Sequence, residues 1–566
     1  MSLIQLGKKT KEEPKYFFQR FENGRCLYPE LPRITTEESI KLFPERAEGL
    51  RVLLIAPPIR LFSMPNIEPI GQCYIASVAL MDGHKVSVLD LNAERKEPIE
   101  DKDLDKFNEW MLNRVIEKIN EVKPDLIGIG GIITQYKTIR SIINTCKENS
   151  GAKIVLGGGI ASCLPLFMVE RLNVDLVSCE EGELTFSEIL YRIENKLSFA
   201  GLEGTVFKDE NGEIIDNGKR PSVESGEDGL DCLPWPSRSL WDVENTYRKN
   251  PVGWLNYNTK WIDGRAVNNE YCLCILGSRG CSYSCDYCYV TYLGKSYRCR
   301  SQKDIVDEME YLKNRYGLTY IHFLDDLYLT NYKWSLEFFE ELRMRKEKNN
   351  FDIFWGATCR TNIISLDIKR AQKENRKHMI EQAFDVSMRQ VCVGIESASP
   401  TILKSIDKSG QTQETIAMCV AEVKRIFGIL DASFMIGSPN ETKETIQETI
   451  DFCLKHNIDV ETIFYTTAFP GTPFWELANS KQLISKLVRG YKCDANNDDF
   501  EKYFELLGEN SQRCRTNFSD TLTDEELIKE GNRATQILGS KNKRHPKVFD
   551  PHTGDRIALG AEMADL

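Results

Sequence analysis

The chain has 566 residues, of which 41% are hydrophobic and 28% charged, a composition typical of a soluble globular protein with about three or four domains. Its net charge of −12 argues against broad binding of nucleic acids, whose phosphates attract basic surfaces. No apolar run approaches the length of a membrane span, and the first residues lack a signal-peptide core. We therefore expect a cytoplasmic protein with neither a nucleic acid nor a membrane as partner, and without disulfides among its 18 cysteines.

The first two segments are an extension and an α/β domain. Residues 1–48 are polar and mixed in charge, with aromatic side chains near Phe17, and we expect this N-terminal extension to pack on another domain. Over residues 49–200, continuous apolar runs alternate with helical patterns, which predicts buried parallel strands joined by helices. The predicted strands are residues 51–56, 85–90, 125–131, 153–159 and 174–179. Five such units make a Rossmann-like, doubly wound sheet, which binds ligands at the carboxyl edge of its strands.

A connector is predicted over residues 201–268. It contains two β-rich runs on either side of Asn211-Gly212, a dipeptide that is the strongest short hairpin signal. The segment Leu-Pro-Trp-Pro-Ser-Arg at 233–238 is stiffened by its prolines. We therefore expect a hairpin and a rigid link between two domains.

Strand and helix patterns resume over residues 269–474 and predict a second α/β domain. Its strands are predicted at 271–277, 320–326, 354–360, 390–397, 432–442 and 462–467. Six strands with crossover helices predict a partial (β/α)6 barrel of the TIM type, in which the active site lies at the C-terminal ends of the strands. The residues found there are Asp326, Arg360, Glu396, Ser397 and Gly437. Residues 475–566 form a mostly helical C-terminal region, where Thr523 and Glu526 have the spacing of a capping box.

Three cysteines, Cys281, Cys285 and Cys288, follow the first strand of this domain in the run Gly-Ser-Arg-Gly-Cys-Ser-Tyr-Ser-Cys-Asp-Tyr-Cys-Tyr (277–289). Three thiolates on one short loop can hold three irons of a [4Fe–4S] cluster and leave the fourth iron open to another ligand. The alternative is a structural zinc site with a fourth thiolate from nearby. The candidates for that fourth ligand are Cys272, Cys274 and Cys299. Zinc sites usually combine two spaced Cys/His pairs, so the spacing favours the cluster.

The spacing Cys-x3-Cys-x2-Cys, with the aromatic Tyr287 before the third cysteine, resembles the signature of the radical S-adenosylmethionine (radical SAM) superfamily. The resemblance implies that SAM chelates the open iron. One electron, from a donor such as flavodoxin or ferredoxin, then cleaves SAM to methionine and a 5′-deoxyadenosyl radical. By the same resemblance, Asp326, Arg360 and Glu396 hold the ribose or methionine part of SAM. The full set of SAM-binding residues expected is Tyr287, Asp326, Arg360, Glu396, Ser397 and Gly437.

Residues 49–200 resemble the cobalamin-binding domain that precedes the radical SAM domain in one large subclass. The matching pieces are Ile70-Gly71, Gly83-His84-Lys85-Val86, Gly157-Gly158-Gly159 and Glu181-Gly182-Glu183. The loop at 57–71 has no histidine where the wider cobalamin family carries Asp-x-His-x-x-Gly, so we expect cobalamin to bind without a histidine on cobalt. The cobalamin-binding residues expected are Met64, Asn66, Gly130, Gly131, Thr134, Gly157, Gly158, Gly159, Glu181 and Gly182.

The resemblance implies a cobalamin-dependent radical SAM methyltransferase that methylates an unactivated carbon or a phosphorus centre by way of the 5′-deoxyadenosyl radical and methylcobalamin. Two alternatives stay open. One is an enzyme of the same architecture that catalyses cyclisation, ring contraction or rearrangement without net methylation; the other is a non-catalytic iron–sulfur or zinc-binding protein. No segment resembles a peptide-recognition domain, which favours a small-molecule substrate over a peptide or protein. The sequence assigns no catalytic side chain.

Overall fold

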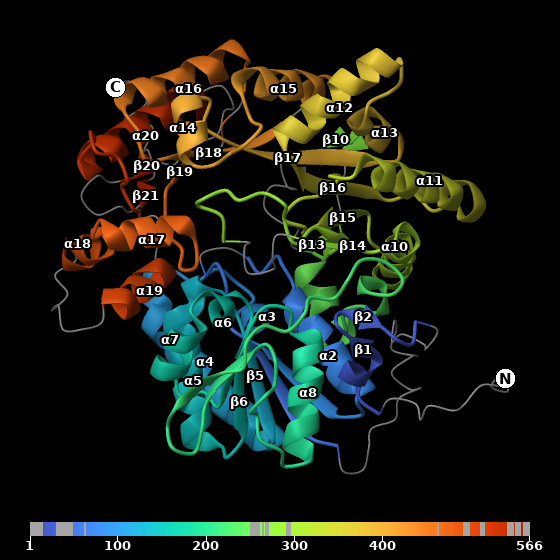
Figure 1. The fold of residues 1–566 in the computed structure, drawn as a ribbon, viewed down its shortest axis with the longest axis vertical. Helices are drawn as coiled ribbons and strands as arrows, with labels where there is room; N and C mark the ends of the chain where they lie inside the picture. The colour runs from blue at the N-terminus through green and yellow to red at the C-terminus, as the bar shows by residue number, and fades with distance from the viewer. Residues whose placement is uncertain are drawn as a thin grey trace.

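The protein consists of two α/β domains and a helical C-terminal region (Figure 1). The computed structural model describes residues 15–29, 49–61, 64–249, 261–262, 265–266, 271–289, 296–428, 430–458, 460, 463–490, 499–509, 515–539, 548–549 and 556–557. In Figure 1 the N-terminal domain (blue to teal) lies below the second α/β domain (green to orange), and the C-terminal helices (orange to red) flank both. Within the ranges just given, no helix is both long and apolar enough to cross a membrane.

The N-terminal domain is built on a sheet of order β4-β3-β5-β6-β7-β8-β9. Its parallel part comprises β3 (Arg51–Ala56), β4 (Lys85–Asp90), β5 (Leu126–Gly130), β6 (Lys153–Gly157) and β7 (Leu176–Ser178). These are the five strands predicted from the apolar runs, and their order is that of a doubly wound fold. The Rossmann-like prediction is therefore confirmed.

Helices cover both faces of this sheet because successive residues of a strand point to opposite sides. Leu54 of β3 belongs to the core shared with α2 and α8, whereas Leu53 belongs to the core shared with α4 and α5. The helices and short turns of the domain are α2 (Ile70–Met81), α3 (Leu91–Glu94), η2 (Asp101–Asp103), α4 (Leu104–Val122), η3 (Ile133–Gln135), α5 (Tyr136–Asn149), α6 (Gly159–Cys163), α7 (Pro165–Arg171) and α8 (Glu183–Glu194).

The hairpin expected in the connector instead extends the N-terminal sheet. Strands β8 (Thr205–Lys208) and β9 (Ile214–Asp216) pair antiparallel with each other, and β8 pairs with β7. The pairing satisfies backbone groups that the edge of β7 would otherwise expose. Part of the N-terminal extension also packs on this domain: η1 (Phe17–Arg20) lies beside α8, and the Phe17 amide donates to Asp82 at 2.6 Å.

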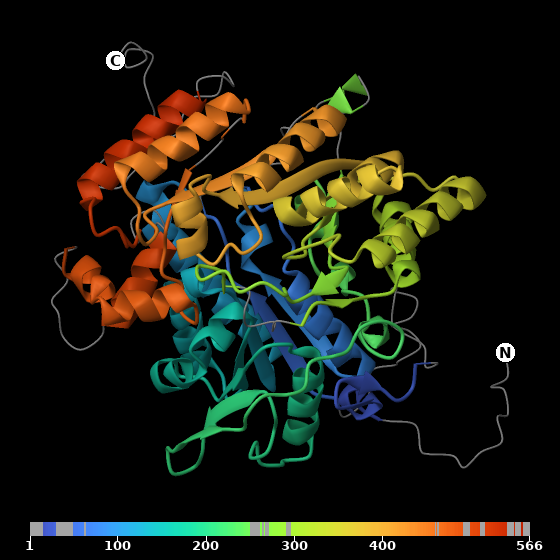
Figure 2. The ribbon, with the colours of Figure 1, turned by 45° about the horizontal axis from the view of Figure 1, so that its top comes forward.

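The second domain contains six parallel strands in sequence order, which confirms the predicted open barrel. They are β12 (Cys272–Ile275), β15 (Tyr320–Phe323), β16 (Phe354–Cys359), β17 (Met388–Glu396), β18 (Asp431–Ile436) and β19 (Ile463–Tyr465). Figure 2 shows the helices packed outside this curved sheet. They are α10 (Gln302–Tyr316), α11 (Tyr332–Asn349), α12 (Thr361–Glu374), α13 (Met379–Asp385), α14 (Pro400–Ser405), α15 (Gln413–Phe427) and α16 (Lys443–Lys455).

The C-terminal region is helical in its described parts, as predicted. It comprises α17 (Pro473–Ser480), α18 (Leu483–Gly490), α19 (Asp499–Glu509) and α20 (Asp524–Gly539). Helix α20 packs beside α16 (Figure 2) and begins with the expected capping box, in which Thr523 and Glu526 each accept the other's amide. The remaining short elements are β1 (Phe21–Glu22), β2 (Arg25–Cys26), η4 (Leu230–Cys232), η5 (Arg238–Leu240), η6 (Val243–Tyr247), β10 (Trp261–Ile262), β11 (Arg265–Ala266), β13 (Ser278–Arg279), β14 (Arg298–Cys299), β20 (Val548–Phe549) and β21 (Arg556–Ile557).

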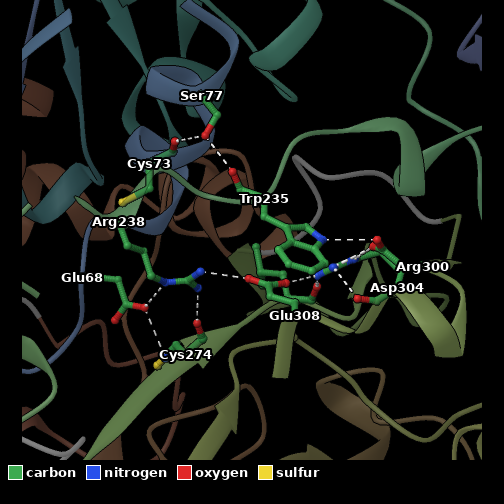
Figure 3. A network of polar contacts seen from close by, with 10 residues as sticks. Glu68, Cys73, Ser77, Trp235, Arg238, Cys274, Arg300, Asp304 and Glu308 are labelled. Carbon is green, nitrogen blue, oxygen red and sulfur yellow. Dashed lines mark hydrogen bonds and ion pairs between the residues drawn. The ribbon is translucent and has the colours of Figure 1, made fainter. Parts of the chain in front are cut away.

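A buried ion network joins the two α/β domains (Figure 3). Arg238, from the proline-held link, bonds Glu308 of α10 at 2.9 Å, Glu68 before α2 at 3.3 Å and the Cys274 carbonyl at 2.6 Å. Arg300 extends the network because it pairs with Glu308 at 2.5 Å. The side chain of Arg238 is only 2% exposed, so each of these charges depends on its partners.

Candidate active site

The cysteine loop lies at the C-terminal end of the first barrel strand and is held on two sides. The Asp286 amide donates to the Ile406 carbonyl at 3.2 Å, and the Asp286 carbonyl accepts from the Phe474 amide at 3.1 Å. Cys285 is buried, whereas Cys281 and Cys288 are partly accessible. Three thiols outside any disulfide on one anchored turn can ligate three irons of a [4Fe–4S] cluster, so the residues fit that group.

The cysteines considered as a fourth zinc ligand lie on other elements. Cys272 and Cys274 are on β12, where they pack with Tyr320 in a small apolar cluster. Cys299 is on β14, opposite Ser278. These positions support the interpretation that the loop acts with its own three thiols.

Arg360 lies directly against the cysteine loop. Its Nη1 donates to the sulfur of Cys285 at 3.3 Å, and its guanidinium carbon lies 3.6 Å from the centre of the Tyr283 ring. Only 7% of the residue is exposed. The sequence predicted Arg360 as a SAM-binding residue, but its contacts are with the loop that carries the cysteines.

A second cation, Lys408, was missed from the sequence. Its Nζ lies 2.7 Å from the Tyr287 hydroxyl and 2.9 Å from Glu396 Oε1, and the same carboxylate accepts from Tyr287 at 3.2 Å. Burial and then the charge of Glu396 raise the pKa of Tyr287. Glu396 has the left-handed φ of 63°, an unfavourable conformation that often marks a functional position. Lys408 thus connects Tyr287 and Glu396, two residues predicted to bind SAM. It lies in the turn after α14, where the sequence has no motif that would mark it.

The paired carboxylates after β15 have different surroundings. Asp325 is buried and accepts from the Gly277 amide at 3.0 Å and from the Ser278 hydroxyl, so it supports the start of the cysteine loop. Burial raises the pKa of Asp325 to about 7. Asp326 is exposed, and its charge adds to the effect of burial in raising the pKa of Cys281. The predicted SAM contact at Asp326 therefore lies on the accessible side, near the first cysteine.

Two other predicted SAM-binding residues, Ser397 and Gly437, contact helices α16 and α20. The Ser397 hydroxyl bonds Thr449 of α16 and accepts from the Ser399 amide, both at 3.1 Å. Gly437 has φ 94°, and a side chain there would meet Leu527 of α20 at 3.0 Å. Both residues contact helices outside the sheet, and their binding of SAM stays a prediction.

At the carboxyl edge of the N-terminal sheet, the predicted glycines separate into open and covered positions. Gly157 has open space where a side chain would lie, with no atom within 4 Å. Gly158 has φ 80°, and a side chain there would approach the Gly131 carbonyl to 2.7 Å. Gly130 faces Gln72. An open glycine beside a tight glycine turn makes a cradle for a bulky ligand, so this part of the edge fits cobalamin.

Other residues predicted to bind cobalamin serve different purposes. Glu181 forms an ion pair with Arg298 at 2.5 Å and lies 3.7 Å from Arg279. Although burial alone would raise the pKa of Glu181, these cations hold it below the usual value. A side chain at Gly182 would meet Ile75 at 3.0 Å. Glu181 thus joins the two domains, whereas Gly182 packs within the N-terminal domain; that these two residues contact cobalamin stays a prediction.

Three further predicted contacts lie around the edge. Met64 is exposed and Asn66 half-buried, in the loop before α2. The Thr134 carbonyl is covered by α19, because a side chain at Gly508 would lie 2.6 Å from it. His84 lies at the opposite, amino end of β4, where its Nδ1 accepts from the Leu50 amide at 3.1 Å. This contact gives His84 a structural role at that end of the sheet.

The cysteine loop and the glycine edge meet at Tyr289, one residue after the third cysteine. The Tyr289 hydroxyl donates to the Gly159 carbonyl. A side chain at Gly159 would lie 3.1 Å from the Tyr289 ring. The two candidate cofactor sites, on separate domains, therefore share a contact.

Comparison with known families gives each domain a counterpart. Residues 275–453 match the model of the radical SAM superfamily, and residues 64–190 match the model of the B12 binding domain. An uncharacterized methyltransferase of Pyrococcus horikoshii is 29% identical over 77% of this chain and 84% of its own. The cytidylyl-2-hydroxyethylphosphonate methyltransferase of Streptomyces wedmorensis is 23% identical over 76% and 82%, respectively. An anaerobic magnesium-protoporphyrin IX monomethyl ester cyclase of Rubrivivax gelatinosus is 24% identical over 70% and 63%.

Solved structures share the fold across both domains. The radical SAM methyltransferase TsrM from Kitasatospora setae, with cobalamin and a [4Fe–4S] cluster bound, matches with a TM-score of 0.60 at 18% identity. The match covers 88% of this chain and 91% of that one. Another structure of the same protein holds tryptophan as substrate with a SAM analogue. The order of domains, the cysteine spacing and the two family matches agree: this chain carries a radical SAM domain at residues 275–453 and a B12 binding domain ahead of it at residues 64–190.

Proposed function

We propose that the protein is a cobalamin-dependent radical SAM methyltransferase that acts on an unactivated carbon or a phosphorus centre of a small molecule. The observation that carries the proposal is the contact of Tyr289 with Gly159, because it brings the cysteine loop to the glycine edge. Two cofactors bound at these places would be neighbours. Methyltransferases among the relatives of similar domain order support the same conclusion.

Each cofactor has residues that would hold it. Cys281, Cys285 and Cys288 would bind a [4Fe–4S] cluster, and Gly157 to Gly159 would accommodate cobalamin. When bound, the cluster would supply the electron for SAM cleavage, taken from a donor such as flavodoxin or ferredoxin, and cobalamin would supply the methyl group. The loop at 57–71 would meet the corrin without a histidine.

The residues around Glu396 would orient SAM. SAM presents a carboxylate, which a cation recognises, and ribose hydroxyls, which a carboxylate accepts from. Lys408 and Glu396 offer these groups side by side, and Tyr287 holds both in place. Their side chains are only 6% and 12% exposed, so water competes little with a ligand there.

Product analysis tests the proposal. Protein reconstituted anaerobically with iron, sulfide and hydroxocobalamin is given SAM and a reductant together with candidate small molecules. S-adenosylhomocysteine formed in step with 5′-deoxyadenosine indicates methylation. Formation of 5′-deoxyadenosine alone, with a substrate rearranged but not methylated, would contradict it in favour of the cyclase-type activity that one relative carries.

A further inference from the structure

Arg360 donates a hydrogen bond within the protein from each of its three nitrogens, which uses three of its five N–H groups. Nη1 donates to the Cys285 sulfur at 3.3 Å, Nη2 to the Ser409 carbonyl at 3.0 Å and Nε to Asn362 Oδ1 at 3.2 Å. The residue is 7% exposed. Because each of its three nitrogens already donates within the protein, the guanidinium is held in one orientation at the end of β16.

The flat face of the same guanidinium holds the cysteine loop a second time. Its carbon lies 3.6 Å from the centre of the Tyr283 ring, which is a cation–π contact. Tyr283 stands between the first two cysteines in the sequence. The Tyr283 hydroxyl in turn accepts from Asn362 Nδ2 at 3.1 Å. Asn362 thus bonds both stacked partners, and neither Arg360 nor Tyr283 can turn without breaking a hydrogen bond.

We propose that Arg360 is a positioning residue for the iron–sulfur cluster, which orients Cys285 and raises the potential at which the cluster is reduced, and that it is not a ligand of SAM. The inference rests on the proposed function, which places the cluster on Cys281, Cys285 and Cys288. A donor to a ligating sulfur stabilises the more negative, reduced state of a cluster and so raises its reduction potential.

The charge of Arg360 is permanent, which suits this role. Arginine stays protonated at every pH that proteins tolerate, whereas Asp326, near Cys281, carries a negative charge that opposes reduction. Lys408 does not offset that charge, because it is paired with Glu396 at 2.9 Å. Arg360 brings a positive charge into direct contact with Cys285 of the loop.

Arg360 also joins the cysteine loop to the turn that carries Lys408. Arg360 donates to the carbonyl of Ser409, the residue that follows Lys408. The Thr361 hydroxyl donates to Gln411 in the same turn at 2.8 Å. The start of α12 therefore holds both the cysteine loop and the Lys408 turn. SAM binding should depend on Arg360 only through this support.

The test compares Arg360→Gln and Arg360→Lys with Arg370→Gln, which removes an exposed arginine from the same helix. Each protein is reconstituted anaerobically without SAM, and its iron content and cluster midpoint potential are measured. SAM binding is then measured separately, and thermal unfolding checks the fold. For Arg360→Gln we expect an intact cluster whose reduction equilibrium is about tenfold less favourable, which is about 59 mV lower for one electron.

Arg360→Lys keeps the charge but loses the planar fork, so its potential should fall in the same direction by less. Arg370→Gln should match the wild type, and SAM affinity should change little in all three. An unchanged potential in both Arg360 variants, with SAM affinity at least tenfold weaker, would overturn the inference and make Arg360 a SAM ligand. A wild-type protein that takes up no four-iron cluster would instead contradict the proposed function, so the two failures are distinct.

Discussion

Two cations lie near the cysteine loop, and they differ in the groups to which they are bonded. Arg360 uses all three nitrogens within the protein. The ammonium of Lys408 carries three N–H donors and meets two partners, Tyr287 and Glu396. The sequence predicted the arginine as the SAM contact because it ends a barrel strand, and it missed the lysine because a turn position has no comparable pattern.

Replacement of Lys408 tests this difference directly. Lys408→Met removes the partner of a buried carboxylate, and loss of one member of such a pair costs about 2–5 kcal/mol. We expect SAM binding to weaken at least tenfold while iron content stays at the wild-type level. Lys404→Met, an exposed lysine on the preceding helix, is the matched control. Equal SAM affinity in both variants would contradict the assignment.

The buried carboxyl of Asp325 should make the stability of the protein depend on pH. Burial raises the pKa of this carboxyl to about 7 in the folded protein, above its value near 4 in an unfolded chain. The folded state therefore binds the proton more tightly, so stability falls as the pH rises from about 4 through 7. In Asp325→Asn this contribution is absent. Denaturant unfolding of the apoprotein should show that the free energy of unfolding falls less between pH 5 and pH 8 in the variant than in the wild type. An equal fall in both proteins would refute the assignment.

For whole elements, the positions of the strands could be predicted from the sequence, but the pairing at the edge of the sheet could not. Continuous apolar runs such as 51–56 and 126–130 indicate buried parallel strands by composition alone. The hairpin at 205–216 was also visible, through Asn211-Gly212. Its attachment to β7 was not, because pairing across an edge depends on which strand remains exposed after folding.

Helix α19 is anchored on the N-terminal domain, and a substitution in this helix can test that contact. Arg140 forms ion pairs with Glu501 and Glu505, and Gly508 lies against the Thr134 carbonyl. Gly508→Ala would add about 1 kcal/mol of helix propensity, yet its Cβ would lie 2.6 Å from that carbonyl. The backbone cannot yield cheaply, and overpacking costs about 1–3 kcal/mol.

We therefore expect Gly508→Ala to lower the melting temperature and to speed amide hydrogen exchange in α19. Gly151→Ala, where a side chain meets no atom within 4 Å, is the control. A Gly508→Ala protein as stable as Gly151→Ala would show that α19 does not rest on η3 in solution.

At the scale of the whole molecule, the relation of the domains depends on ion networks that no local pattern reveals. Glu181 resembles a cobalamin motif in sequence but binds Arg298 of the barrel domain. Arg238 lies in a proline-held link, yet its side chain meets Glu68 and Glu308 from separate domains (Figure 3). Such partners are more than 60 residues apart in the chain, so only the folded structure identifies them.

Arg238→Met should destabilise the protein strongly. It leaves Glu68 buried without its cation and removes one of the two cations paired with Glu308, and breaking a buried pair costs about 3–5 kcal/mol. Burial already raises the pKa of Glu68, so the variant should bind a proton there and lose less stability at pH 5 than at pH 8. The double variant that adds Glu68→Gln should recover part of the loss, because it removes the carboxylate left without a cation. Denaturant unfolding measures all three, and an Arg238→Met protein within 1 kcal/mol of the wild type would exclude the network as a support.

The central claim is that three cysteines of one loop hold a cluster that cleaves SAM. The most direct measurement is the amount of 5′-deoxyadenosine formed per protein by anaerobically reconstituted enzyme, with SAM and a strong reductant, against the variant in which Cys281, Cys285 and Cys288 are all alanine. We predict steady formation by the wild type and none above background by the variant. Equal formation by both proteins would contradict the account.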